Sequence, residues 1–164
     1  MRVALMTHLS MCRPSHIFSK DNDVIPTQPG SAAPRGGRTL LRILCVDDNH
    51  DVADSEAHLL NLVGFNARAC YSGATALREA AIFRPYICLI DLNMPGMDGD
   101  ELAIRLRQQE GGPPPVLMAI TARCDEESNR RIREAGLNPH MVKPVDPNEL
   151  VAVNEGIRTF CEAS

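Results

Sequence analysis

Short apolar runs that end in chemically active polar residues constrain the fold of this chain more than any other feature. Four such runs, at residues 42–46, 86–90, 116–120 and 140–142, are too short for helices and together are rich in Ile, Val and Leu. This pattern is typical of strands buried on both faces of a parallel sheet. The residues that follow the runs directly are Asp47-Asp48, Asp91, Thr121 and Lys143. Because parallel strands end at one edge of an open sheet, we expect these side chains to meet in one pocket.

The residue types in this pocket limit its chemistry. Three carboxylates at close range repel one another unless a cation is shared between them. A hard divalent ion such as Mg²⁺ suits such oxygens and takes a remaining ligand from a phosphoryl group. Lys143 and Thr121 carry donors for phosphoryl oxygens. Asp91, alone at its strand end, is the candidate nucleophile that would form an aspartyl phosphate.

The segments between the runs carry the signals of helices. Apolar spacing and capping residues predict helices at about 52–63, 72–83, 98–110, 126–135 and 146–162, and residues 65–71 predict a further strand. The expected N-caps of the second, third and fifth helices are Ser72, Asp98 and Asp146, and Asp98 with Glu101 forms a capping-box pattern. Alternating strands and helices predict an α/β fold.

Each of these polar residues also has a simpler interpretation. Asp47 and Asp48 could cap the first helix, since a carboxylate is stabilised at a helix N-terminus whatever the function. Asp91 could be a turn residue, Thr121 could cap a loop, and Lys143 could neutralise surface acids. The common register of all of them at strand ends favours a metal and phosphoryl site instead.

The motifs at these positions resemble the receiver domain of bacterial two-component response regulators. The resemblance runs from about Leu40 to the C-terminus, and it rests on four motifs in the same order and spacing: residues 46–49 (VDDN), 91–99 (DLNMPGMDG), Thr121-Ala122 and Lys143-Pro144. It implies a flavodoxin-like, doubly wound (βα)5 fold with a five-stranded parallel sheet in the order 2-1-3-4-5.

The resemblance also implies a cofactor and a phosphate donor. Asp91 would accept a phosphoryl group from a phosphohistidine of a sensor histidine kinase or a histidine phosphotransfer protein. The implied cofactor is Mg²⁺, held by Asp48 directly, by Asp47 largely through water, by Asp91, and by the backbone carbonyl of Asn93. The domain would catalyse its own phosphorylation and dephosphorylation, and we do not expect it to be an enzyme acting on other substrates.

The remaining motif positions would bind the phosphoryl group and report its presence. By resemblance, Thr121, the backbone of Ala122 and Lys143 contact the phosphoryl oxygens, and Pro144 sets the geometry of the loop. Phosphorylation would then shift a pre-existing equilibrium of the last two loops.

Two positions depart from the usual pattern of the family. His140 stands where an aromatic switch residue is common, and it could either take part in switching or be an exposed strand-end residue. Arg123 stands at a position that, together with Asn93, influences the lifetime of the phosphate in the family.

Composition divides the chain into a tail and one domain. Residues 1–38 carry five Lys/Arg and two Asp/Glu, a formal charge of +3, whereas residues 39–164 carry twelve and nineteen, a formal charge of −7. We expect residues 1–38 to be a disordered or weakly ordered tail and residues 39–164 to form the receiver domain. The chain lacks a convincing signal peptide, a membrane-length apolar segment and C-x-x-C pairs among its six cysteines, so we expect a cytoplasmic location.

Three functions compete. The first is a stand-alone receiver that relays phosphate or regulates an unknown protein target, without direct nucleic-acid binding or membrane insertion, because the domain is acidic and no output domain follows it. The second is a phosphorylation-independent, receiver-like interaction module. The third is an aspartate-nucleophile phosphohydrolase of the haloacid dehalogenase type, which would need an Asp-x-Asp signature after the first strand, where this chain has Asp47-Asp48.

Overall fold

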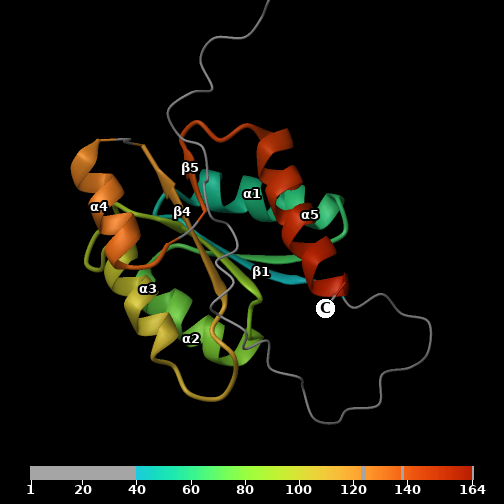
Figure 1. Cartoon of the computed structure of the whole chain (residues 1–164), viewed down its shortest axis with the longest axis horizontal. Coiled ribbons are helices and arrows are strands. Elements are labelled where there is room, and N and C mark those ends of the chain that lie inside the picture. The colour runs from blue at the N-terminus through green and yellow to red at the C-terminus, as the bar shows by residue number, and fades with distance from the viewer. Residues whose placement is uncertain (1–39, 123–124, 138, 164) are drawn as a thin grey trace, which may run out of the picture.

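Five parallel strands form the centre of the protein. The computed structural model describes residues 40–122, 125–137 and 139–163, and the expected tail at residues 1–38 lies outside them. The strands are β1 (Arg42–Val46), β2 (Asn66–Cys70), β3 (Ile87–Asp91), β4 (Val116–Thr121) and β5 (His140–Val142). They pair in the order β2-β1-β3-β4-β5, all in parallel (Figure 1). This confirms the predicted doubly wound α/β fold.

Helices cover both faces of the sheet (Figure 1). Their bounds are α1 (His50–Leu62), α2 (Gly73–Phe83), α3 (Gly99–Arg107), α4 (Glu126–Glu134) and α5 (Pro147–Ala163). Apolar residues of α1 and α5 pack with Ile43, Leu89 and Ile120 on one face, and those of α2, α3 and α4 pack with Leu44, Ile90 and Ala119 on the other. Successive strand residues alternate between the two cores because side chains of a strand point to opposite faces.

The helix starts show which acids are used as caps. Asn49 is the N-cap of α1, and its side chain accepts a hydrogen bond from the N–H of Asp51 at 3.1 Å. Neither Asp47 nor Asp48 therefore caps α1. The predicted caps Ser72 and Asp146 are confirmed, since the Ser72 side chain accepts from Thr75 N and the Asp146 carboxylate accepts from the N–H groups that follow it.

The predicted cap of α3 is confirmed in position, but the expected capping hydrogen bond is not formed. Asp98 is the N-cap residue, and its side chain accepts no hydrogen bond from the first turn. One carboxylate oxygen of Asp98 instead lies 3.3 Å from Nη2 of Arg131, because α4 brings that guanidinium over the start of α3. The helix is also shorter than expected and ends at Arg107. The segment after α3 contacts α2, because Nε2 of Gln109 donates a hydrogen bond to the carbonyl of Leu77 at 2.8 Å.

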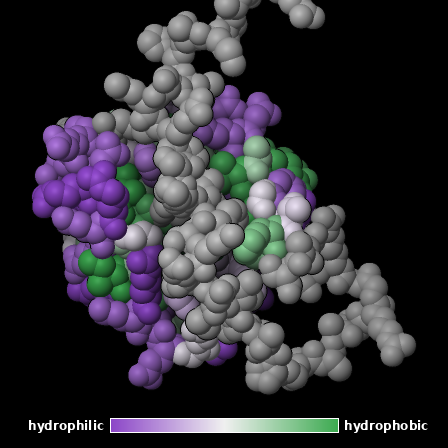
Figure 2. All heavy atoms as spheres, viewed as in Figure 1, coloured by the Kyte–Doolittle hydropathy of each residue, from purple (hydrophilic) through white to green (hydrophobic). Residues whose placement is uncertain are grey.

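Two regions of the face seen in Figure 2 differ in polarity. The side chains over α4 are strongly hydrophilic, whereas green and pale, more hydrophobic side chains lie over part of α5. In the described part of the chain, no helix is both long enough and apolar enough to cross a membrane.

Candidate functional site

The register of the parallel sheet brings the predicted site residues to one edge. Asp91 is the last residue of β3 and has Ile120 as its partner on β4, and Thr121 is the last residue of β4. Lys143 follows β5 directly, and its backbone N–H donates to the carbonyl of Thr121 at 2.8 Å. Asp47 follows β1, and its N–H donates to the carbonyl of Cys70 at 3.1 Å. The sequence predicted that these residues lie at the carboxyl ends of the strands along one edge of the sheet, and this is confirmed.

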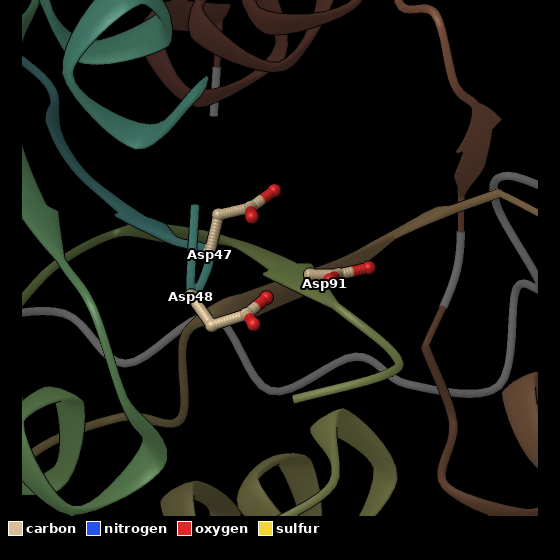
Figure 3. Close-up of side chains that lie close together, drawn as sticks. All are labelled: Asp47, Asp48 and Asp91. Carbon is tan, nitrogen blue, oxygen red and sulfur yellow. The ribbon is translucent and has the colours of Figure 1, made fainter. Parts of the chain in front are cut away.

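Three carboxylates converge at this edge. One oxygen from each of Asp47, Asp48 and Asp91 lies within 4.8 Å of the others. Figure 3 shows the three side chains projecting to the same side, two from the end of β1 and one from the end of β3. Asp47 and Asp91 are only 2% and 5% exposed, whereas Asp48 is exposed. The cluster is therefore open to solvent through Asp48 and closed around the other two acids.

Lys143 is the cation of this cluster. Its Nζ lies 2.6 Å from Oδ2 of Asp47 and 3.3 Å from Oδ2 of Asp91. Burial opposes the charge of Lys143, but the hydrogen bond to Asp47 and the charge of Asp91 outweigh it, so the pKa of Lys143 is raised. Burial also raises the pKa of Asp91, against the lowering effect of Lys143. One ammonium group does not balance three carboxylates.

Backbone contacts orient the Asp47 carboxylate and shape the loop after Asp91. The second oxygen of Asp47 accepts a hydrogen bond from Asn49 N at 2.9 Å, so both of its oxygens have donors. The chain after Asp91 turns sharply, because the N–H of Gly99 donates to the carbonyl of Leu92 at 3.0 Å. A Cβ at Gly99 would stand 2.2 Å from the backbone oxygen of Asp91, so only glycine fits where α3 begins.

The other predicted positions lie around this cluster. Asn93 is exposed, and its backbone N–H lowers the pKa of the Asp91 carboxyl against the effect of burial. Ala122 is exposed directly after β4, and the Lys143–Pro144 peptide bond is cis. His140 is the first residue of β5, is half-buried, and has Ala119 as its strand partner. Arg123 lies outside the described residues, so its predicted role stays a prediction.

Glu56 is a fourth acid near the site, which the sequence prediction missed. It lies on α1, is 8% exposed, and burial together with the charge of Asp47 raises its pKa to about 7. The signal was present in the sequence, because Val52, Glu56 and Leu59 fall on one helical stripe. An acid on an apolar stripe is the pattern that could have identified it.

Glu56 and Lys143 line the same cleft. This cleft has a volume of about 850 Å³ and lies between α1 and the start of α5. Its lining is mainly apolar and includes Val52, Leu59, Pro144, Val145 and Leu150. Lys143 connects this cleft to the carboxylate cluster, because its Nζ also contacts Asp47 and Asp91.

The donor set fits a hard divalent cation. Asp47, Asp48 and Asp91 offer oxygen ligands only, and Mg²⁺ prefers a few carboxylate oxygens together with water. The cluster carries more negative than positive charge, which a bound cation would relieve. These three residues could therefore hold a hard divalent cation, and the exposed Asp48 leaves the site accessible to water.

Comparison with known proteins gives matches over most of the chain. A family model of the response regulator receiver domain matches residues 43–155. The transcriptional regulatory protein PrrA of Mycobacterium tuberculosis is 37% identical over 116 residues, which are 71% of this chain and 49% of PrrA. The DNA-binding response regulator MtrA of Mycolicibacterium smegmatis is 34% identical over 68% of this chain and 47% of MtrA. The chain thus spans about half the length of these curated relatives.

Solved structures agree with the sequence comparisons. The chemotaxis protein CheY4 of Vibrio cholerae matches with a TM-score of 0.67 at 25% identity, over 71% of this chain and 97% of CheY4. A CheY-like receiver domain protein from Methanospirillum hungatei has the same fold, with a TM-score of 0.67 at 24% identity over 77% of this chain and all of its own. Since the family model covers more than half of the sequence, the chain belongs to the response regulator receiver domain family.

Proposed function

We propose that this receiver domain accepts a phosphoryl group on Asp91 from a phosphohistidine of a sensor histidine kinase or a histidine phosphotransfer protein. The observation that carries the proposal is the carboxylate excess at the strand ends, with Lys143 between Asp47 and Asp91. Asp47, Asp48, Asp91 and the backbone carbonyl of Asn93 would hold Mg²⁺. When bound, the ion would neutralise charge on the phosphoryl oxygens.

The proposed reaction is an in-line transfer. A carboxylate oxygen of Asp91 forms a bond to phosphorus while the bond between phosphorus and the donor imidazole nitrogen breaks, and the imidazole leaves with that electron pair. Such a transfer needs positioning and charge neutralisation more than covalent chemistry from the protein. Lys143 reaches the reacting oxygens from one side, and Thr121 and the backbone of Ala122 would bind them in the product.

Phosphorylation would act as a switch in this proposal. New charge-assisted bonds to Thr121 and Lys143 would draw in the loops after β4 and β5 and shift an existing equilibrium. His140 would take part if its ring moves with these loops, and Asn93 and Arg123 would tune the lifetime of the phosphate. A partner would then recognise the phosphorylated form at the face made by α4, β5 and α5, or the phosphoryl group would be transferred onward to another protein.

Labelling with a small phosphodonor tests the proposal. Acetyl phosphate with Mg²⁺ should add one phosphoryl group, seen by intact mass, and chelation of Mg²⁺ should abolish the addition. Asp91→Ala should not be labelled, whereas Asp54→Ala, which removes an exposed acid of α1, should be labelled like the wild type. Labelling of Asp91→Ala at the wild-type level would contradict the assignment.

A second candidate is a receiver-like module that binds a partner without phosphorylation. The apolar cleft beside α1 favours it, because such a surface can bind a partner whatever the state of Asp91. If the wild-type protein is folded and binds Mg²⁺ but takes no phosphoryl label from acetyl phosphate, this candidate is favoured.

Stand-alone action is a separate part of the proposal. The matched region covers 97% of CheY4 but about half of PrrA and MtrA, so the comparisons fit a stand-alone receiver and a receiver within a longer regulator equally well. If the domain acts alone, the phosphorylated protein should bind a protein target and leave DNA fragments unbound in a mobility-shift assay.

A further inference from the structure

Arg131 of α4 contacts both ends of the loop that follows the phosphoacceptor strand. At the far end, its Nε lies 3.0 Å from Oδ2 of Asp100 and its Nη2 lies 2.6 Å from Oδ1 of the same residue. Nη2 also lies 3.3 Å from the carboxylate of Asp98. At the near end, Nη2 lies 3.4 Å from the carbonyl oxygen of Leu92, and Nη1 lies 3.4 Å from Oδ1 of Asn93. One guanidinium thus joins the start and the end of the 92–98 loop to α4.

The neighbouring arginine of the same helix makes no comparable contact. The Arg131 side chain is 21% exposed and its partner Asp100 is 27% exposed. Arg130 is 55% exposed and pairs with Glu127 and Glu134 of its own helix. A bidentate pair that is partly shielded from water holds its geometry better than exposed pairs do. Arg131 can therefore position the loop, and Arg130 serves as its matched control.

The near end of the loop lies beside the proposed metal site. Leu92 and Asn93 follow Asp91 directly, and the carbonyl of Asn93 is the one proposed Mg²⁺ ligand that comes from the loop. The three carboxylates come from the ends of β1 and β3, whose positions depend on the sheet. Loss of Arg131 should therefore disturb the carbonyl ligand and leave the carboxylates in place.

We propose that Arg131 is a positioning residue for Mg²⁺: by holding both ends of the loop, it keeps the Asn93 carbonyl within reach of the cation. This inference rests on the proposed function, in which that carbonyl is a ligand. Groups that orient metal ligands from outside the coordination shell commonly contribute tenfold or more to metal affinity. Because Lys keeps the charge without the planar fork, it should replace Arg131 only in part.

The test measures Mg²⁺ binding in two independent ways. Amide chemical shifts followed during a Mg²⁺ titration give the affinity without any phosphorylation, and acetyl phosphate labelling gives the Mg²⁺ concentration for the half-maximal rate. In Arg131→Gln, both half-saturation concentrations should rise by about tenfold, while the labelling rate at saturating Mg²⁺ stays near that of the wild type. Arg131→Lys should lie between the two, and Arg130→Gln should match the wild type.

Other outcomes overturn the inference. Simple electrostatics predicts the opposite sign, because removal of a positive charge near a cation site should lower the Mg²⁺ requirement. A lower or unchanged half-saturation in Arg131→Gln, in a protein shown to be folded by its spectrum, would therefore contradict the positioning role.

Asp100→Asn provides a second variant of nearly the same shape that disrupts the same contact. It should raise the Mg²⁺ requirement too, and its effect should not add to that of Arg131→Gln. Full additivity of the two changes would likewise count against the inference. If wild type bound Mg²⁺ but took no label, the proposed phosphorylation would fail while the chemical-shift titrations still decided the role of Arg131.

Discussion

Two groups of acids on either side of the β3–α3 loop differ in how their charge is balanced. The carboxylate cluster consists of Asp47, Asp48 and Asp91 with Lys143 as its cation. The helix brace consists of Asp98 and Asp100 with Arg131. The cluster has three acids for one cation and buries two of them, whereas the brace has one exposed acid, Asp98, and one partly buried acid, Asp100, around one guanidinium.

The pKa shifts of the two groups have opposite directions. Burial raises the pKa of Asp91 in the carboxylate cluster. The hydrogen bonds from Arg131 lower the pKa of Asp100 in the helix brace. The brace therefore stabilises the ionised acid, and the cluster destabilises it until a further cation arrives. A buried excess of acid indicates a binding site, whereas an acid that accepts a bidentate pair from a guanidinium near the surface indicates a structural contact.

Among the predicted effects, the loss of labelling rate in Lys143→Ala should be the largest. It removes the one protein cation of the carboxylate cluster, so the labelling rate with acetyl phosphate and saturating Mg²⁺ should fall by about 10²–10³. Arg105→Ala, which removes an exposed arginine of α3 paired with Glu101, is the control and should keep the wild-type rate. If the labelling rate of Lys143→Ala stayed within a factor of about three of the wild type, Lys143 would not be the cation that the carboxylate cluster needs for labelling.

Glu56→Gln should change the dependence of stability on pH. Burial raises the folded pKa of Glu56 from 4.5 to about 7, so the native protein binds more protons than the unfolded chain between these values. The contribution of Glu56 to stability is therefore present at low pH and is lost as the pH rises through about 7. Without Mg²⁺, Glu56→Gln should gain up to about 3 kcal/mol over wild type between pH 4.5 and pH 8.

Urea denaturation across this pH range measures the effect of Glu56. Glu110→Gln, which changes an exposed acid after α3, is the matched control and should show no such gain. Wild-type and Glu56→Gln profiles that run parallel would remove Glu56 from the buried electrostatics of the site.

Asp100→Ala should change stability by a smaller amount, should destabilise the protein, and should have the opposite pH dependence. The folded pKa of Asp100 is lowered, so its stabilising contribution is present above the unfolded pKa and is lost as the pH falls through the folded pKa. At neutral pH the free energy of unfolding should drop by about 1–2 kcal/mol, as for a partly buried hydrogen-bonded pair. Denaturation at pH 7 and pH 3 should show the difference between wild type and variant shrinking at the lower pH. A difference that stays constant would mean that the contact to Arg131 is not ionic.

Arg130→Ala should have the smallest effect. Its contacts with Glu127 and Glu134 are exposed pairs within one helix, so the urea midpoint of the variant should stay close to that of the wild type at moderate salt. A loss as large as that of Asp100→Ala would show that the brace gains nothing from its burial and fork geometry.

The sequence predicted the carboxylate cluster because a parallel sheet leaves little freedom there. Once β1, β3, β4 and β5 are identified as parallel strands, Asp91, Thr121 and Lys143 must end at one edge. The order of the strands came from the family resemblance, and the structure confirms it. The burial of Glu56 could not be foreseen with the same certainty, because its neighbours on the other side of the cleft come from α5, far along the chain.

The helix brace shows why local signals fail. Asp98 and Glu101 satisfy a capping pattern, yet the Asp98 side chain faces Arg131, which stands more than thirty residues later in the sequence. A charge-assisted contact with a guanidinium competes with the local backbone N–H for the same carboxylate. Likewise, Asn49 rather than either preceding acid caps α1, which leaves both acids for the cluster.

A Mg²⁺ titration followed by NMR tests the central claim most directly, because both acid groups are observed in one experiment. The carboxylate cluster should bind the cation, so the amides of residues 47–49, 91–93 and 121–122 should shift in a saturable manner. The amide chemical shifts of α4 around Arg131 should change only weakly. The chemical-shift changes at the cluster should vanish in Asp48→Ala and Asp91→Ala but persist in Asp98→Ala. Saturable shifts centred on Asp98 and Asp100, or none at the strand ends, would contradict the assignment of the buried acid excess as the cation site.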